Sequence, residues 1–236
     1  MDQLGSPLFW LALGNIIIVN IVLSGDNAIV IALAARSLPA QQQRRAIFYG
    51  SAAAIVLRIV LTLFAVTLLG LPYLKIVGAV LLFYIGARLL ADEGADPDIK
   101  STHTLRAAVQ TILVADLVMS LDNVLGVAAA AKGNMTLLVL GLVISIPLIV
   151  FGSSMMLKLM QRFPIIIVIG AGLLGYLAGE MLFGDVALQP WLGAHLPNLS
   201  LTMPGTGIGL SVPGVVLAVA VVLTGRWLGR RSSNAR

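Results

Sequence analysis

LSGDN, residues 23–27, interrupts the first long apolar run of this chain, and MSLDN, residues 119–123, interrupts a later apolar run in the same way. The two segments are 96 residues apart, and the same displacement aligns Asn20 with Asp116. Apolar helices resemble one another by composition, but this shared Ser-x-Asp-Asn pattern falls at polar positions, which are rare inside membrane segments. We therefore infer that the chain contains an internal repeat.

The composition around this motif is that of a membrane protein. Of 236 residues, 59% are hydrophobic and 11% are charged, and the mean hydropathy is +1.02. Soluble domains are about 45–50% apolar and about 25% charged. The apolar runs are long enough to cross a hydrocarbon layer of roughly 30 Å as helices. We predict an all-α polytopic membrane protein with about seven transmembrane helices, over residues 8–33, 46–70, 73–91, 105–131, 135–158, 164–183 and 209–229.

The repeat extends over three spans in each half. The third span aligns with the sixth, so that Gly78-Ala79 corresponds to Gly170-Ala171. Because each half has an odd number of spans, the halves must have opposite orientations, which is the 3+3 inverted repeat of many secondary transporters. The predicted parts are a first repeat (1–91), a cytoplasmic hinge loop (92–104), a second repeat (105–183), an irregular outer loop (184–208) and a last helix with a basic tail (209–236).

The distribution of positive charge predicts the orientation. Twelve Lys and Arg residues lie on one side of the predicted spans, in the first, third and fifth connections and in the C-terminal tail. The opposite side has only Lys75 and Lys132. Because positively charged loops stay in the cytoplasm, we expect the N-terminus outside and the C-terminus in the cytoplasm. The basic residues at the ends of the spans then serve to orient the chain in the lipid bilayer, so the net charge of +5 does not indicate a nucleic-acid partner.

Three carboxylates lie inside predicted spans: Asp26 in the first, and Asp116 and Asp122 in the fourth. An ionised aspartate near the bilayer centre costs roughly 2.5–3.5 kcal/mol on insertion scales, so such residues usually face a bundle interior and have a partner. Arg58, the only basic residue in the middle of a predicted span, can form a structural ion pair with one of them. The remaining acids need another cation.

The polar side chains near these aspartates offer only oxygen ligands. The chain has no cysteine, and its two histidines, His103 and His195, lie in predicted loops. Oxygen ligands favour Mg²⁺, Ca²⁺ or Mn²⁺ over Zn²⁺ or Cu⁺. Gly25 can loosen the first helix and free main-chain carbonyl groups, but Leu121 takes its place in the repeat. The candidate metal ligands are Asp26, Asn27, Asp122, Asn123, Asp116, Asn20, Ser24 and Ser120.

At these positions the sequence resembles the TerC family of bacterial membrane proteins, within the LysE-type transporter superfamily. Residues 20–28 and 116–124 carry the resemblance, which extends from the first span to about residue 183. The resemblance implies export of Mn²⁺ from the cytoplasm across the bacterial inner membrane. It also implies that the metal-binding pairs are Asp26 with Asn27 and Asp122 with Asn123. Mn²⁺ is then the transported substrate, and no tightly bound cofactor is expected.

The favoured function is a divalent-metal exporter that works by alternating access, with proton exchange as a natural coupling because empty buried carboxylates take up protons. The alternatives are efflux of another cation, either Ca²⁺ or an organic cation, and a membrane component that assists metal loading of exported proteins.

We do not expect an enzyme, since the Tyr-Asp and Gly-x-Gly-Asp pairs of intramembrane aspartyl proteases are absent. Small residues at 128–131 can pack helices within one chain or join two copies in a homodimer. Glu180 has no assigned role.

Overall fold

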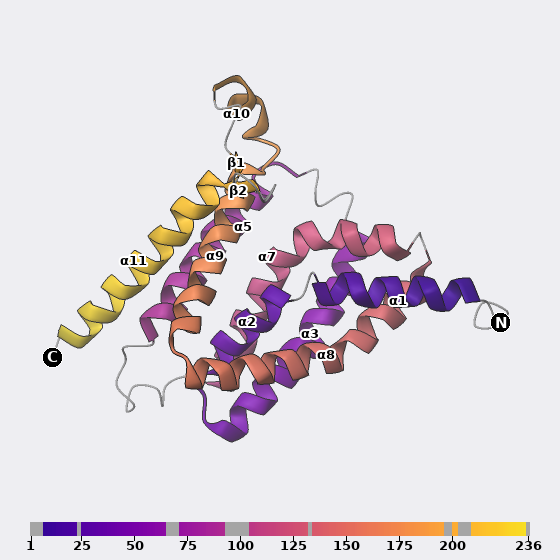
Figure 1. Cartoon of the computed structure of the whole chain (residues 1–236), viewed down its shortest axis with the longest axis horizontal. Helices are drawn as coiled ribbons and strands as arrows, with labels where there is room; N and C mark the ends of the chain where they lie inside the picture. The colour runs from indigo at the N-terminus through magenta and orange to yellow at the C-terminus, as the bar shows by residue number, and fades with distance from the viewer. Residues whose placement is uncertain are drawn as a thin grey trace. The chain divides into compact units, whose positions relative to one another are not determined.

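The computed structural model describes residues 7–22, 25–64, 71–92, 104–131, 134–195, 200–202 and 209–234, and helices dominate this part of the chain (Figure 1). The prediction of an all-α membrane protein is confirmed. The helices are α1 (Pro7–Val22), α2 (Gly25–Ala35), α3 (Ala40–Leu63), α5 (Leu74–Ala91), α7 (Leu105–Ala131), α8 (Met135–Arg162), α9 (Ile165–Phe183), α10 (Gln189–His195) and α11 (Val212–Asn234). The two strands are β1 (Ser200–Thr202) and β2 (Gly209–Ser211).

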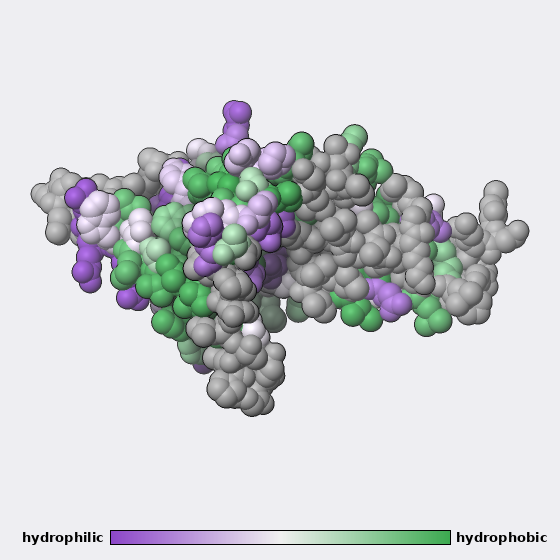
Figure 2. Space-filling view, turned by 90° about the horizontal axis from the view of Figure 1, so that it is seen from above, coloured by the Kyte–Doolittle hydropathy of each residue, from purple (hydrophilic) through white to green (hydrophobic). Residues whose placement is uncertain are grey.

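Five of the described helices are long and apolar enough to cross a membrane, namely α3, α5, α8, α9 and α11. Large apolar side chains on these helices, such as Val56, Val80 and Leu223, are exposed, as expected where a helix faces lipid rather than water. Figure 2 shows hydrophobic side chains, beside hydrophilic ones, among the described residues of the face that it draws. α2 is a shorter apolar helix. The predicted total of seven spans and the inverted repeat stay predictions.

The first predicted span, 8–33, consists of two helices. α1 ends at Val22 and α2 begins at Gly25, and Figure 1 shows that the helix axis changes direction between them. A side chain at Gly25 would meet nothing within 4 Å, so close packing does not require a glycine there. Glycine instead weakens the helix, by about 0.8–1.0 kcal/mol relative to alanine. Leu121, at the equivalent position of the repeat, lies inside the continuous helix α7.

Two compact units divide the described chain. The first unit contains α1, α2, α3, α7 and α8 as far as Leu159, and the second contains α5, α9, α11 and the segment between α9 and α11. The first two predicted spans of each repeat segment, 1–91 and 105–183, therefore pack within the first unit. The third span of each, α5 and α9, packs within the second unit, so each unit is assembled from both parts of the sequence.

The second unit is held together by close contacts between helix backbones. α9 packs against both α5 and α11. A Cβ atom at Gly175 would lie 2.5 Å from the carbonyl oxygen of Leu217, and one at Gly179 would collide with the backbone of Pro213. Small residues that let backbones approach are a common basis of helix association in membranes, where no hydrophobic force drives helices together. The glycines of α9 therefore determine how this unit packs.

The segment between α9 and α11 contains regular structure, so the prediction of an irregular loop over 184–208 is wrong for part of its length. α10 begins at Gln189, and β1 pairs antiparallel with β2, with Ser200 opposite Ser211. A helix of seven residues with Pro190 in its first turn is too short to show a periodic pattern, and so are strands of three residues. β2 also occupies the first residues of the predicted last span, and α11 begins only at Val212.

Candidate functional site

A buried ion pair lies between α3 and α7 in the first unit. The two helices approach closely, because a Cβ atom at Gly50 would lie 2.6 Å from Cδ1 of Ile112. Two turns further along α3, Nη2 of Arg58 donates a hydrogen bond to Oδ1 of Asp116 on α7 at 2.6 Å. Arg58 is only 1% exposed. The expectation that Arg58 pairs with one of the three aspartates is therefore confirmed for Asp116.

Ser120 completes this arrangement. Its hydroxyl accepts a hydrogen bond from Nε of Arg58 at 3.0 Å and donates one to Oδ2 of Asp116 at 3.1 Å. Asp116 and Ser120 are four residues apart on α7, so they lie on the same face of the helix. The three side chains thus form a closed ring of hydrogen bonds in which both carboxylate oxygens accept. Bonds of this kind offset much of the cost of burying the charges.

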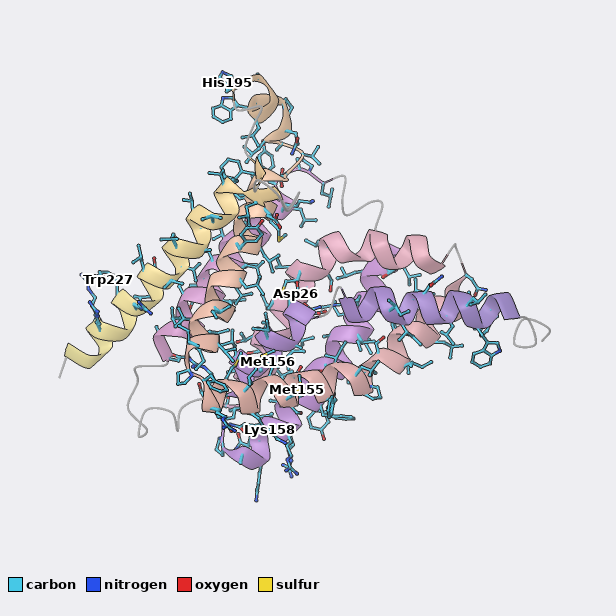
Figure 3. All side chains as sticks on the ribbon, viewed as in Figure 1. Asp26, Met155, Met156, Lys158, His195 and Trp227 are labelled. Atoms are coloured by element: carbon cyan, nitrogen blue, oxygen red, sulfur yellow. The ribbon has the colours of Figure 1, made fainter. Side chains whose placement is uncertain are left out.

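Asp26 and Asn27 lie in the first turn of α2, and Figure 3 shows Asp26 at the start of this helix. Oδ1 of Asp26 accepts a hydrogen bond from the backbone N–H of Asn27 at 2.8 Å. Asn27 is 3% exposed, and neither its side-chain nitrogen nor its oxygen has a hydrogen-bond partner within the described residues. A buried polar group without a partner lowers the stability of the fold by about 1–3 kcal/mol. A bound ligand that interacts with this carboxamide would remove that cost.

The two groups of polar residues belong to one region of the first unit. α2 packs against both α3 and α7. Arg58 and Asp116 are close enough to interact electrostatically with Asp26, the first by attraction and the second by repulsion. Four of the eight candidate ligands therefore lie on two packed helices, Asp26 and Asn27 on α2 and Asp116 and Ser120 on α7, and Asp116 is already paired with Arg58.

The other four candidate ligands lie outside what the structure describes. Ser24 falls between α1 and α2, and the side chains of Asn20, Asp122 and Asn123 are not described, although their backbones belong to α1 and α7. Among the described residues, no three acidic, histidine or cysteine side chains are grouped so that they could hold a metal ion. The predicted metal site stays a prediction.

Two buried serines near this region were not anticipated from the sequence. Ser51 on α3 and Ser153 on α8 are fully buried, and their hydroxyls have no hydrogen-bond partner within the described residues. Ser51 is seven residues before Arg58, on the same helix face. Ser153 follows Gly152, at which a Cβ atom would lie 3.8 Å from Ala28 on α2. The helical spacing from Arg58 was the available signal, but isolated serines in apolar helices are too common to stand out.

The structure also describes several residues that the sequence did not assign to the site. His195 is exposed on α10 in the second unit, stacked on Trp191 with the ring centroids 4.9 Å apart. Met155 is exposed on α8 (Figure 3), as expected for a side chain that faces lipid. Glu180 is exposed on α9. His103 lies outside the described residues.

Comparison with known proteins gives one family and several relatives. A family model described as the integral membrane protein TerC family matches residues 5–233. The uncharacterized membrane protein YjbE of Bacillus subtilis is 42% identical over 177 residues, which cover 75% of this chain and 81% of that protein. The UPF0053 inner membrane protein YgdQ of Escherichia coli K12 is 24% identical over 176 residues, covering 67% of this chain and 74% of that protein. No solved structure matches the chain significantly.

Proposed function

Because this chain belongs to the TerC family of integral membrane proteins, we propose that it is a transporter that exports a divalent metal ion, Mn²⁺, from the bacterial cytoplasm. One observation carries this proposal. The carboxamide of Asn27 is buried without a hydrogen-bond partner in the described residues, and it follows Asp26 in the first turn of α2. A cation with a preference for oxygen ligands would be bound by both groups and would satisfy the carboxamide oxygen.

The proposed ligands come from both repeat motifs. Asp26 with Asn27 and Asp122 with Asn123 are the two pairs, and Asn20, Ser24, Asp116 and Ser120 are adjacent to them. A site with only carboxylate, carboxamide, hydroxyl and carbonyl oxygens suits Mn²⁺, Ca²⁺ and Mg²⁺ alike. The choice of Mn²⁺ rests on the family resemblance of residues 20–28 and 116–124.

The break between α1 and α2 supports a transport site at this point. α1 ends at Val22, and the carbonyl groups of a terminal helical turn have no partner within the helix. They carry the partial negative charge of the helix C-terminus, which favours a cation. Discontinuous helices of this kind form the ion sites of many secondary transporters, which alternate access around a fixed site. We propose that Asp26 binds the ion at this break and that protons neutralise the carboxylates after release.

Direction and location complete the proposal. We propose the orientation that the basic connections predict, with the C-terminus in the cytoplasm and the N-terminus outside, and export in the outward direction. We propose the bacterial inner membrane as the location, because the relative YgdQ is named as an inner membrane protein.

The test is metal uptake into inside-out membrane vesicles from cells that express the chain. Saturable Mn²⁺ uptake is expected, and Asp26→Asn or Asp122→Asn should lower it by about tenfold or more because each removes a charged ligand. Glu180→Gln, which also converts an acid into its amide but at an exposed position of the second unit, is the matched control and should leave uptake unchanged.

Parallel measurements with Ca²⁺ and with an organic cation separate the alternatives. Uptake of either without Mn²⁺ uptake would replace the proposed substrate. Mn²⁺ uptake that survives both aspartate substitutions would refute the proposed site. If vesicles take up no cation at all, a component that assists metal loading becomes the better explanation.

A further inference from the structure

A contact between α2 and α8 brings two distant segments of the first unit together. A Cβ atom at Gly152 of α8 would lie 3.8 Å from the Cβ atom of Ala28 on α2. Earlier on α8, a Cβ atom at Gly141 would collide with the side chain of Ile16 on α1. The contacts follow one another in the same order along both segments, so α8 runs parallel to the chain from α1 into α2 (Figure 1).

The two sides of the contact between Ala28 and Gly152 differ in their exposure. Successive residues of a helix are rotated by about 100°, so in a parallel pair the residue before the contact on one helix and the residue after it on the other point to the same side. Asn27 and Ser153 are in these positions, and both are buried. On the opposite side Phe151 is 70% exposed. Asn27 and Ser153 therefore share the side that faces the interior of the unit.

The hydroxyl of Ser153 has no hydrogen-bond partner within the described residues, and neither does the carboxamide of Asn27. A serine inside a helix can donate to the backbone carbonyl four residues earlier. Ser145 and Ser154, also on α8, do so at 2.8 and 2.7 Å. The hydroxyl of Ser153 is 0% exposed and makes no such bond. Two buried groups with unpartnered oxygen atoms thus lie on one side of the same helix contact, as expected for groups that share a ligand.

We propose that Ser153 is a further ligand of the transported ion, and that its hydroxyl oxygen binds the same divalent cation as the carboxamide oxygen of Asn27. This inference rests on the proposed function, because the ion is the one bound by Asp26 and Asn27. Hydroxyl and carboxamide oxygens are neutral, hard ligands of the kind that Mn²⁺, Ca²⁺ and Mg²⁺ accept. The bound ion then joins α2 to α8, and its release removes that link.

The first experiment measures Mn²⁺ binding to the purified full-length protein in lipid nanodiscs, from the EPR signal of the unbound ion. Ser153→Ala should raise the Kd by about tenfold, the size of effect that the loss of one group around a metal commonly has. Ser145→Ala is the matched control, because Ser145 is equally buried on the same helix but its hydroxyl is bonded to the carbonyl of Gly141. This control should bind Mn²⁺ as the wild type does. The melting temperature of each metal-free variant shows whether it is folded.

The second experiment tests the helix contact without any metal. The distance of 3.8 Å between the two Cβ positions suits a disulfide, and the chain has no cysteine of its own. The double variant Ala28→Cys with Gly152→Cys should therefore form an intramolecular disulfide under mild oxidation.

Three results would overturn the inference. The first is a folded Ser153→Ala protein that binds Mn²⁺ as tightly as the wild type. The second is an equal loss of affinity in Ser145→Ala, because the effect would then come from any serine of α8. The third is the absence of the disulfide, because α2 and α8 would then not be adjacent at this point. A wild type that forms the disulfide in its cysteine variant but binds no Mn²⁺ would refute the proposed function, and the inference with it, so the two failures are distinguishable.

Discussion

The carboxylate of Asp185 accepts a hydrogen bond at 3.0 Å from the backbone N–H of Tyr73, 112 residues earlier in the chain. It also accepts from the N–H groups of Lys75 and Ile76, in the first turn of α5. Tyr73 has a φ of 67°, a left-handed conformation that is uncommon for a residue other than glycine. Asp185, fully buried, therefore caps α5 from a distant segment and supports this conformation.

Asp185 predicts how the stability of the second unit depends on pH. Burial raises the pKa of its carboxyl group, but hydrogen bonds from the N–H groups of Ala187, Tyr73, Ile76 and Lys75 lower it, and the pKa lies below its ordinary value. A lowered pKa in the folded state gives stability that is present above the unfolded pKa of about 3.9 and is lost as the pH falls through the folded pKa. The stabilisation is therefore complete at neutral pH and fades only in strongly acidic solution.

We expect Asp185→Asn to lower the free energy of unfolding by about 1–3 kcal/mol at neutral pH, since it weakens several hydrogen bonds to a buried acceptor. The difference from wild type should shrink toward pH 3. Thermal unfolding in detergent at several pH values measures both effects. The control is the exposed acid Glu180. The Glu180→Gln variant should have the same unfolding temperature as the wild type at every pH. An Asp185→Asn protein as stable as the wild type at neutral pH would contradict this account.

Gly179 and Gly172 on α9 make a matched pair. A Cβ atom at Gly179 would collide with the backbone of Pro213 on α11, which cannot give way, whereas one at Gly172 would lie 3.6 Å from a side-chain carbon of Val222. Gly179→Ala should therefore destabilise the protein by about 1–3 kcal/mol through overpacking. Gly172→Ala should be neutral or stabilising by up to about 1 kcal/mol, because alanine favours a helix. Equal melting temperatures for the two variants would show that α9 and α11 do not pack in this way.

Particular residues show what the sequence could and could not predict. The span 105–131 coincides with α7, since a long apolar run identifies a helix by length alone. The pairing of Arg58 followed from its rarity in the membrane. The choice of Asp116 as its partner did not, because three aspartates were available and only the packing of α3 against α7 selects one.

Tertiary packing also explains the other differences. The repeat aligned the third span with the sixth. It did not reveal that α5 and α9, the third helix of each repeat segment, pack with α11 in the second unit. The contacts responsible are backbone approaches at residues such as Gly175, whose partners lie far along the chain. The cap formed by Asp185 has the same character, since a single aspartate in a Gly/Pro-rich segment resembles any turn residue.

Asn27 predicts a conflict between stability and function. Its buried carboxamide lacks a partner within the described residues, so Asn27→Leu should stabilise the metal-free protein by about 1–3 kcal/mol. The same change should weaken Mn²⁺ binding by about tenfold or more if the carboxamide oxygen is a ligand. Ser51→Ala removes another buried, unpartnered polar group and should stabilise without affecting binding. Melting curves and metal titrations on the same samples test both halves, and an Asn27→Leu protein that binds Mn²⁺ normally would remove Asn27 from the site.

The orientation can be tested directly because the chain has no cysteine. Gln41, on α3, and Val186, in the segment after α9, are both exposed, and each can be replaced by a single cysteine. The orientation predicted from the basic connections has Gln41 in the cytoplasm and Val186 outside. A maleimide that cannot cross membranes should therefore label Val186→Cys in intact spheroplasts and Gln41→Cys only in inside-out vesicles. The opposite pattern would reverse the predicted topology, and with it the proposed direction of transport.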